Sequence, residues 1–246
     1  MLNPGSSRPQ AIERLLCQSG ASIAITERLV KSAAAYQGPD AYKIMELLSQ
    51  NHGLGLPIPE GVVLSAAGNT GPCGFEIMKL LCQHQGTSIY ISEGVIEATA
   101  RNTGPCGYDI VKVLCQHRDR SLLISEDVLK AAAGNTGPCG YELVKLLCQH
   151  RGPSLLISEK LVKATVENAG KGHEILMLLF QRLGTNLPVS EEIVEEAAQN
   201  TGPFAYEVMK VLCRHLGASL PISERALKAA AGNTGIYGYR LRDVLS

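Results

Sequence analysis

Cysteine and histidine recur at short spacing along the chain, most clearly in the stretch "GNTGPCGYELVKLLCQHRG" at residues 134–152. This stretch places Cys139, Cys148 and His150 close together in sequence. Thiolates and imidazoles are metal ligands, and a thiol beside a histidine can act as a nucleophile with its base. The stretch therefore suggests two chemical hypotheses, a metal site and a catalytic thiol.

Helix geometry argues against both hypotheses. A helix over residues 139–148 would separate its two thiols by about 13 Å and turn them to nearly opposite faces, whereas zinc ligands lie about 2.0–2.3 Å from one ion. Other copies of the motif carry Phe180 in place of Cys148 and Arg182 in place of His150. Phenylalanine cannot ligate a metal but can fill a core. We therefore expect packing cysteines, with no metal, no cofactor and no catalytic residue.

The cysteines at the start of the motif keep a second interpretation. Cys73, Cys106 and Cys139 are expected near a helix N-terminus, where the helix dipole could lower a thiol pKa. We favour a structural role for them as well.

The motif recurs because the chain repeats itself every 33 residues, or 32 where one residue is lost before Lys171. Asn-Thr-Gly occurs at 69–71, 102–104, 135–137, 200–202 and 233–235. Asn168-Ala169-Gly170 fills the missing place, and a degenerate copy surrounds Gln37. A fixed period of this length is typical of stacked supersecondary units.

Each unit predicts two short helices. In "SEDVLKAAAGN" (125–135), Ser125 caps the first helix and Glu126 lies at the positive end of its dipole. Asn135 is expected to end this helix in a left-handed conformation, with a side chain that satisfies backbone groups of the turn. The second helix is "CGYELVKLLCQH" (139–150). The helix-start position recurs at Thr26, Pro59, Ser92, Ser125, Ser158, Ser190 and Ser223.

One such pair of helices cannot enclose a core, so neighbouring pairs must stack. The sequence therefore predicts an all-α fold, an elongated α-solenoid of about seven 33-residue two-helix repeats with half-repeats at both ends. It would form one domain over residues 10–246, preceded by a disordered N-terminal tail at residues 1–9.

The repeats also contain a file of aromatic residues. Their position is the junction between the two helices, where we favour packing over a stacking platform for bases or sugars. The file comprises Tyr42, Phe75, Tyr108, Tyr141, Tyr206 and Tyr239, with His173 at the odd place.

The period, the "AAA" of the first helix and "GHEILMLLFQRLG" at 172–184 resemble ankyrin repeats. More specifically, "ISEDVLKAAAGN…GYELVKLLCQHRG" looks like the ankyrin-like repeats in C-terminal regions of fungal NACHT-type, NLR-like signalling ATPases. The likeness covers about residues 10–246, but the Thr-Pro-Leu-His opening of ankyrin repeats is missing and "GPSLLIS" need not form their β-hairpin. No phosphate-binding Gly-x-x-x-x-Gly-Lys-Ser/Thr loop is present. The resemblance implies a partner-sensing or ligand-sensing array without catalytic residues.

Composition narrows the classes of partner. The formal net charge is zero and 45% of residues are apolar, which gives no bulk electrostatic reason to expect nucleic acid or an anionic membrane. No apolar run is long enough to cross a bilayer, and "MLNPGSSRPQ" lacks the apolar core of a signal peptide. We expect a cytoplasmic protein whose eight cysteines are reduced.

The exposed stripe of the first helix changes charge from unit to unit, while that of the second helix stays nearly constant. A fixed scaffold with a changing charge mosaic is how solenoids recognise partners, although a solvated face under no constraint would look the same. We predict a non-enzymatic protein-protein interaction or ligand-sensing scaffold that binds through the variable face of the first helices and the inter-repeat loops. The expected partner-binding residues are Arg118, Arg120, Asp127, Lys130, Arg151, Lys160, Lys163, Glu192, Glu195, Arg225 and Lys228.

Two alternatives remain. The chain could be a structural solenoid that self-associates end to end, because its terminal units are truncated. An enzyme with a concave pocket would need a convergent, non-repeating set of catalytic residues, and the sequence contains no such set.

Overall fold

The protein is described by a computed structural model that covers residues 26–52, 58–85, 89–118, 124–151 and 157–245. These residues form 14 α-helices and no β-strand. The all-α prediction is confirmed. Spatial contacts divide the chain into two compact units, Met1–Leu122 and Leu123–Ser246.

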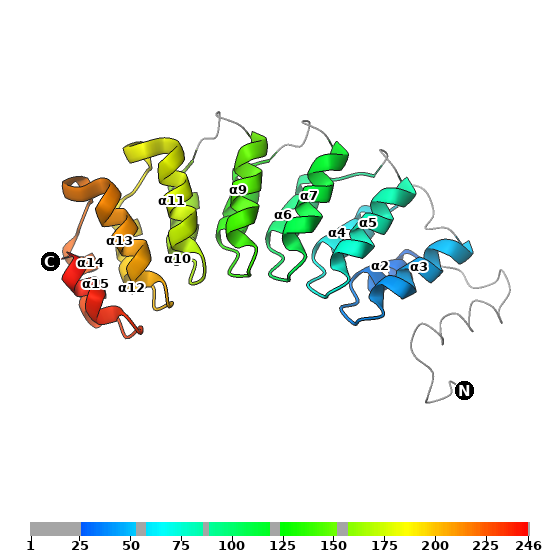
Figure 1. The fold of residues 1–246 in the computed structure, drawn as a ribbon, viewed down its shortest axis with the longest axis horizontal. Coiled ribbons are helices and arrows are strands. Elements are labelled where there is room, and N and C mark those ends of the chain that lie inside the picture. Colours follow the sequence, from blue (N-terminus) through cyan, green and yellow to red (C-terminus); the bar gives the residue numbers. More distant parts are fainter. Residues whose placement is uncertain (1–25, 53–57, 86–88, 119–123, 152–156, 246) are drawn as a thin grey trace. The chain divides into compact units, whose positions relative to one another are not determined.

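Within the first unit, the described helices form three pairs in two layers (Figure 1). The first helices of successive pairs contact one another, and so do the second helices. The first helices are α2 (Glu27–Ala34), α4 (Glu60–Ala67) and α6 (Glu93–Ala100), and the second helices are α3 (Ala41–His52), α5 (Gly74–Gln85) and α7 (Gly107–Arg118).

The second unit has the same organisation, with four described pairs. Its last pair is shortened, because α15 has 8 residues where the other second helices have 12. The first helices are α8 (Glu126–Ala133), α10 (Glu159–Glu167), α12 (Glu191–Gln199) and α14 (Glu224–Gly232), and the second helices are α9 (Gly140–Arg151), α11 (Gly172–Leu183), α13 (Ala205–Leu216) and α15 (Gly238–Leu245). The expected half-repeat at the N-terminus and the disordered tail at 1–9 lie outside the described residues, and a single domain over 10–246 stays a prediction.

Helix starts lie where the sequence places them, at Thr26, Pro59 and each repeated serine. The hydroxyl of Ser92 accepts a hydrogen bond from the Val95 amide, 3.3 Å away, and so caps α6. It also donates to the carboxylate of Glu60, the first residue of the preceding α4. Ser158 donates to Glu126 and Ser190 to Glu159 in the same way. The caps therefore also link successive pairs within a unit.

The repeated asparagine forms a second link at the other end of the first helix. The Asn69 amide group donates to the carbonyl oxygens of Ala34 (2.8 Å) and Tyr36 (3.0 Å) in the preceding pair, and its Oδ1 accepts from the Gly71 amide (2.8 Å). Asn102, Asn168 and Asn233 make the same three contacts. We call this arrangement the asparagine staple.

The predicted left-handed conformation of the repeated asparagine is wrong for the asparagines that end α10, α12 and α14. Asn168, Asn200 and Asn233 have φ of −68°, −60° and −68°. An extended backbone at the end of the helix points the amide group toward the carbonyls of the preceding turn. The two tertiary hydrogen bonds made there by Asn168 and Asn233, with the local bond to the glycine amide, outweigh the local preference of asparagine for a left-handed cap. Left-handed residues instead end two second helices, at Gly184 (φ 59°) and Gly217 (φ 50°).

The glycine of Asn-Thr-Gly is required by the same contact. A Cβ on Gly104 would lie 2.5 Å from the carbonyl oxygen of Thr70, and one on Gly71 would lie 2.7 Å from the Gln37 backbone. These distances are far below van der Waals contact, so any side chain here would push successive turns apart and break the staple.

The staple also shows how the degenerate first copy aligns with the later repeats. Asn69 binds the carbonyl of Tyr36 at the offset with which Asn102 binds that of Asn69. Tyr36, rather than Gln37, therefore occupies the asparagine position of the first described pair.

Replacing Asn69 by alanine should lower the free energy of unfolding by roughly 2–4 kcal/mol, because it removes three hydrogen bonds and leaves buried carbonyls unpaired. The measurement is urea unfolding followed by circular dichroism. Asn186→Ala, at an exposed asparagine, is the control and should change stability by under about 0.5 kcal/mol. Equal effects of the two substitutions would show that the staple contributes little.

Candidate functional site

The cysteine and histidine motif does not converge on one point. In α9, Cys148 is fully buried while His150 is exposed, and Cys139 lies half-buried before the helix. Across the described residues, no group of three or more histidine, cysteine or acidic side chains is arranged to hold a metal ion. The motif is thus divided between the core, the helix junction and the surface.

The cysteines at the start of the second helices contact the preceding turn. The Cys73 thiol donates to the carbonyl of Pro39 at 3.3 Å, and the Cys106 thiol to that of Pro72 at 3.6 Å. They therefore act as small polar packing groups between successive pairs.

Of the cysteines later in the motif, Cys82, Cys115 and Cys148 are buried in the core and Cys213 is half-buried. Burial raises the pKa of Cys82 and of Cys115 to about 11. Burial also raises the pKa of Cys213. Their thiolates are therefore scarce at neutral pH, and none of the seven cysteines in the described ranges is in a disulfide.

Iodoacetamide at pH 8 should label Cys82 and Cys115 in the folded protein far more slowly than in urea, since both thiols are buried and protonated. Peptide mass spectrometry gives the rates, with half-buried Cys73 as the internal comparison. The raised pKa also predicts stability that is full below about pH 9 and falls toward pH 11, because the unfolded thiols ionise first. Labelling of Cys82 at the unfolded rate would contradict its place in the core.

The aromatic file occupies the start of the second helices. Its rings are half-buried except that of Tyr239, which is 55% exposed. Lys145 Nζ lies 5.7 Å from the centroid of Tyr141, and Lys210 Nζ 5.8 Å from that of Tyr206. These rings thus contact lysines of their own helices.

The expected partner-binding residues fall into three groups. Arg120 lies outside the described residues, and Arg118 and Arg151 end α7 and α9 with side chains that are not described. Lys163 and Glu195 are half-buried. The exposed members are Asp127, Lys130, Lys160, Glu192, Arg225 and Lys228. All members with described side chains lie on the first helices of the second unit.

Lys163 is engaged within the scaffold. Its Nζ lies 2.5 Å from Glu192 Oε1 and 3.0 Å from Glu196 Oε1, which joins α10 to α12. The hydrogen bond from Lys163 lowers the pKa of Glu192, and both carboxylates raise the pKa of Lys163. The sequence showed opposite charges near one another, but only the stacking of α10 on α12 pairs them.

Replacing Lys163 by methionine should raise the pKa of Glu192 toward its ordinary value, measured by NMR titration of the side-chain carboxyl. Because folding lowers this pKa, the ion pair contributes at neutral pH and is lost as the solution is acidified. Lys160→Met, at an exposed neighbour in α10, should leave the pKa of Glu192 in place. An unchanged Glu192 titration in the Lys163 variant would mean that the pair does not form in solution.

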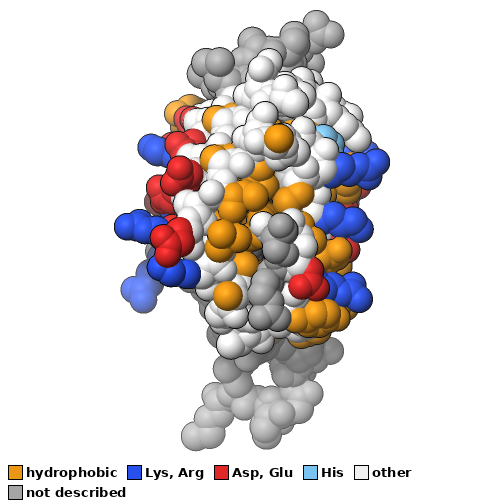
Figure 2. Space-filling model, turned by 90° about the vertical axis from the view of Figure 1, so that its left-hand side faces the viewer, with side chains coloured by type: hydrophobic (Ala, Val, Ile, Leu, Met, Phe, Trp, Pro, Cys, Tyr) orange, Lys and Arg blue, Asp and Glu red, His pale blue; other side chains and the backbone are white. Residues whose placement is uncertain are grey.

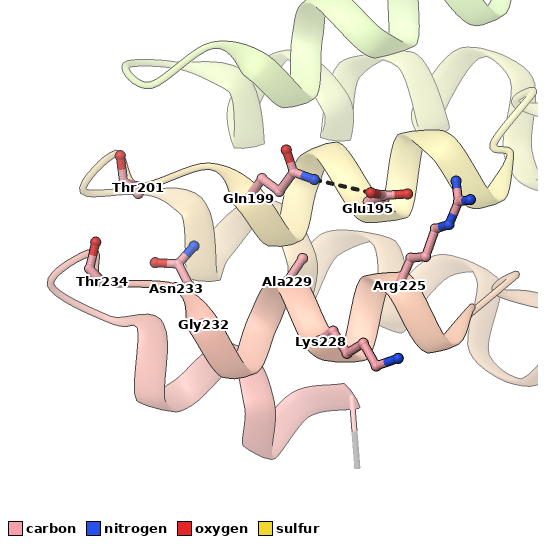
Figure 3. A pocket seen from close by; sticks show the side chains of 9 residues that line it. All are labelled: Glu195, Gln199, Thr201, Arg225, Lys228, Ala229, Gly232, Asn233 and Thr234. Carbon is pink, nitrogen blue, oxygen red and sulfur yellow. Dashed lines mark hydrogen bonds between the residues drawn. The ribbon is translucent and has the colours of Figure 1, made fainter.

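An open groove of about 600 Å³ lies between α12 and α14, on the stripe of first helices (Figure 3). Glu195 and Gln199 form its α12 side, where Gln199 donates to Glu195 at 3.1 Å. Arg225 and Lys228 extend from α14, and Thr201 and Thr234 lie at the turns. Three of the expected partner-binding residues thus line one groove. Gln199, Thr201 and Thr234 were not among the expected partner-binding residues, because nothing in the repeat marks a groove.

Two ring contacts were also missed. His173 stacks on Phe204 with centroids 4.9 Å apart, and Phe180 stacks on His215 at 4.4 Å. Both join α11 to the following pair. His173 and Phe180 differ from the residues common at their repeat positions. This difference was the sequence signal that could have indicated the ring contacts.

The repeated sequence matches a known family model. The domain of unknown function DUF7104 matches residues 15–38, 80–107, 114–143, 146–175 and 178–209, together more than half of the chain. The chain therefore belongs to the DUF7104 family. The last four segments each run from one second helix to the next, so the family repeat is the helix pair in a shifted frame. No curated protein and no solved structure matches.

None of the helices in the described ranges combines the length and apolar character needed to span a bilayer.

Proposed function

We propose that the protein is a non-enzymatic repeat scaffold that binds another protein through its first-helix stripe, with the groove between α12 and α14 as the centre of contact. The groove carries this proposal, since it is a concave surface lined by polar and charged side chains that differ between pairs. The fixed Ser–Glu and asparagine links maintain the backbone while these exposed residues vary.

The charges of the groove favour an extended peptide segment with an acidic side chain. Arg225 has no carboxylate partner among the described residues and can donate a bidentate pair of hydrogen bonds to a carboxylate of the ligand. Lys228 lies on the same side, where its Nζ is 2.6 Å from Glu224 Oε1, so a carboxylate of the ligand could share this ammonium group with Glu224. The hydroxyls of Thr201 and Thr234 and the amide of Gln199 offer hydrogen bonds to a peptide backbone. Glu195, on the α12 side, suits a donor group of the same ligand.

The resemblance to ankyrin-like repeats of NACHT-type, NLR-like proteins supports a sensing role of this kind. Free thiols in the described residues support a reducing, cytoplasmic environment. We assign no catalytic residue, because the groove contains no nucleophile paired with a base.

The test is a peptide-display selection on the purified chain, followed by fluorescence anisotropy with synthetic copies of the selected peptides. Arg225→Glu/Lys228→Glu should weaken binding by about tenfold or more, because reversing two cations repels an acidic ligand. Lys210→Glu reverses one exposed lysine on the second helix α13 and should leave binding within about twofold.

Peptides that bind the groove variant as tightly as the parent chain would remove the groove from the proposal. A loss of binding in the Lys210 variant alone would place the partner surface on the second helices.

A further inference from the structure

Hydrophobic side chains gather at the C-terminal end face, over α14 and α15, between columns of charged side chains (Figure 2). On these two helices, Leu227 of α14 is 42% exposed and Tyr239 of α15 is 55% exposed. Arg240 contacts Tyr206, Tyr237 and Tyr239 at 5.4–5.7 Å from their ring centroids, while Leu227 remains exposed.

Comparison with the same position in other first helices shows that Leu227 lacks a neighbouring helix. Leu227 is the fourth residue after the N-cap of α14, and at this position Val63, Leu129, Val162 and Val194 are all 0% exposed. Val194 lies on α12, which packs against α14, and Val162 lies on α10, which packs against α12. This position is therefore the one that each first helix turns toward the next first helix.

The first described pair exposes the complementary position. Leu29 is the third residue after the N-cap of α2 and is 40% exposed, whereas Leu161, Ile193 and Ala226 at the same position are 0% exposed. In α2 the neighbouring Val30 is buried, and in α14 the neighbouring Ala226 is buried. Leu29 and Leu227 are thus the two halves of one repeated contact.

The first and last described pairs also hold the two separate halves of a Ser–Glu link, a hydroxyl donor and a carboxylate acceptor. Glu224, the first residue of α14, holds the position at which Glu60, Glu126 and Glu159 accept a hydroxyl from the following pair. Thr26, the N-cap of α2, holds the position of the donating serines. The donor at one end of the array matches the acceptor at the other.

We propose that the C-terminal end face of one chain packs on α2 of a second copy, in the manner of one pair on the next. Leu227 meets Leu29 of the second copy, and the hydroxyl of Thr26 of the second copy donates to Glu224. The asparagine staple is absent from this contact because Tyr36 holds its position, so the contact is weaker than those inside a unit. A head-to-tail contact joins two different surfaces, so each added copy brings a further unfilled half with it.

Sedimentation velocity of the full chain over a range of concentrations tests the proposal. The average mass should rise continuously above that of the 26.3 kDa monomer. Leu227→Glu and Leu29→Glu should each remain monomeric, because an unpaired carboxylate would be buried in the contact. Their equimolar mixture should form a dimer that grows no further, since each variant retains one intact half of the contact.

Tyr90→Glu, at an apolar residue that is 58% exposed and lies on neither end face, is the control and should assemble like the parent chain. Circular dichroism checks the fold. Leu227→Ser and Leu29→Ser replace any glutamate variant that loses helix. A parent chain that stays monomeric, or a mixture that stays monomeric, would overturn the proposal. Assembly abolished by the Leu227 variant but unaffected by the Leu29 variant would overturn it in favour of contact between two C-terminal faces.

Discussion

The asparagine staple is the constraint on which the rest of the structure depends. One buried side chain supplies two donors to carbonyls of the preceding turn and one acceptor to the glycine of its own turn. The turn after a short helix leaves backbone groups that water cannot reach, and the staple satisfies them while fixing the distance between pairs. The Asn-x-Gly pattern follows directly, because only glycine permits the close approach of the turns.

Fixing the backbone at both ends of the first helix leaves its exposed residues free to differ. The Ser–Glu link and the staple lie at the two helix termini, and paired apolar residues such as Val62 and Val63 fill the space between neighbours. Charge reversals along the exposed stripe should therefore change the free energy of unfolding little. The exception is a side chain that forms an ion pair with the next helix, as Lys163 does. Successive pairs within a unit pack with the same helix positions, and this is why the exposed positions at Leu29 and Leu227 are recognisable.

Patterns local to one repeat predict this structure well, and contacts between repeats do not follow from them. The period, the helix starts at Thr26, Pro59 and the serines, and the buried cysteines follow from capping and apolar spacing. The left-handed asparagine was wrong because a tertiary hydrogen-bond network overrides a local preference. The pairing of Lys163 with Glu192 and Glu196, and the groove between α12 and α14, depend on how one helix lies on the next, which a one-dimensional pattern does not encode.

Native-state hydrogen exchange of an Asn168→Ala variant tests most directly whether the staple couples successive pairs. Asn168 bonds to the carbonyls of Ala133 and Asn135 in the preceding pair and to the amide of Gly170 in its own. If the staple couples the pairs, amide exchange should become faster in both turns, at residues 134–137 and at residues 169–172, and in the helices that flank each turn. Faster exchange at 169–172 alone, with the preceding pair unchanged, would contradict it.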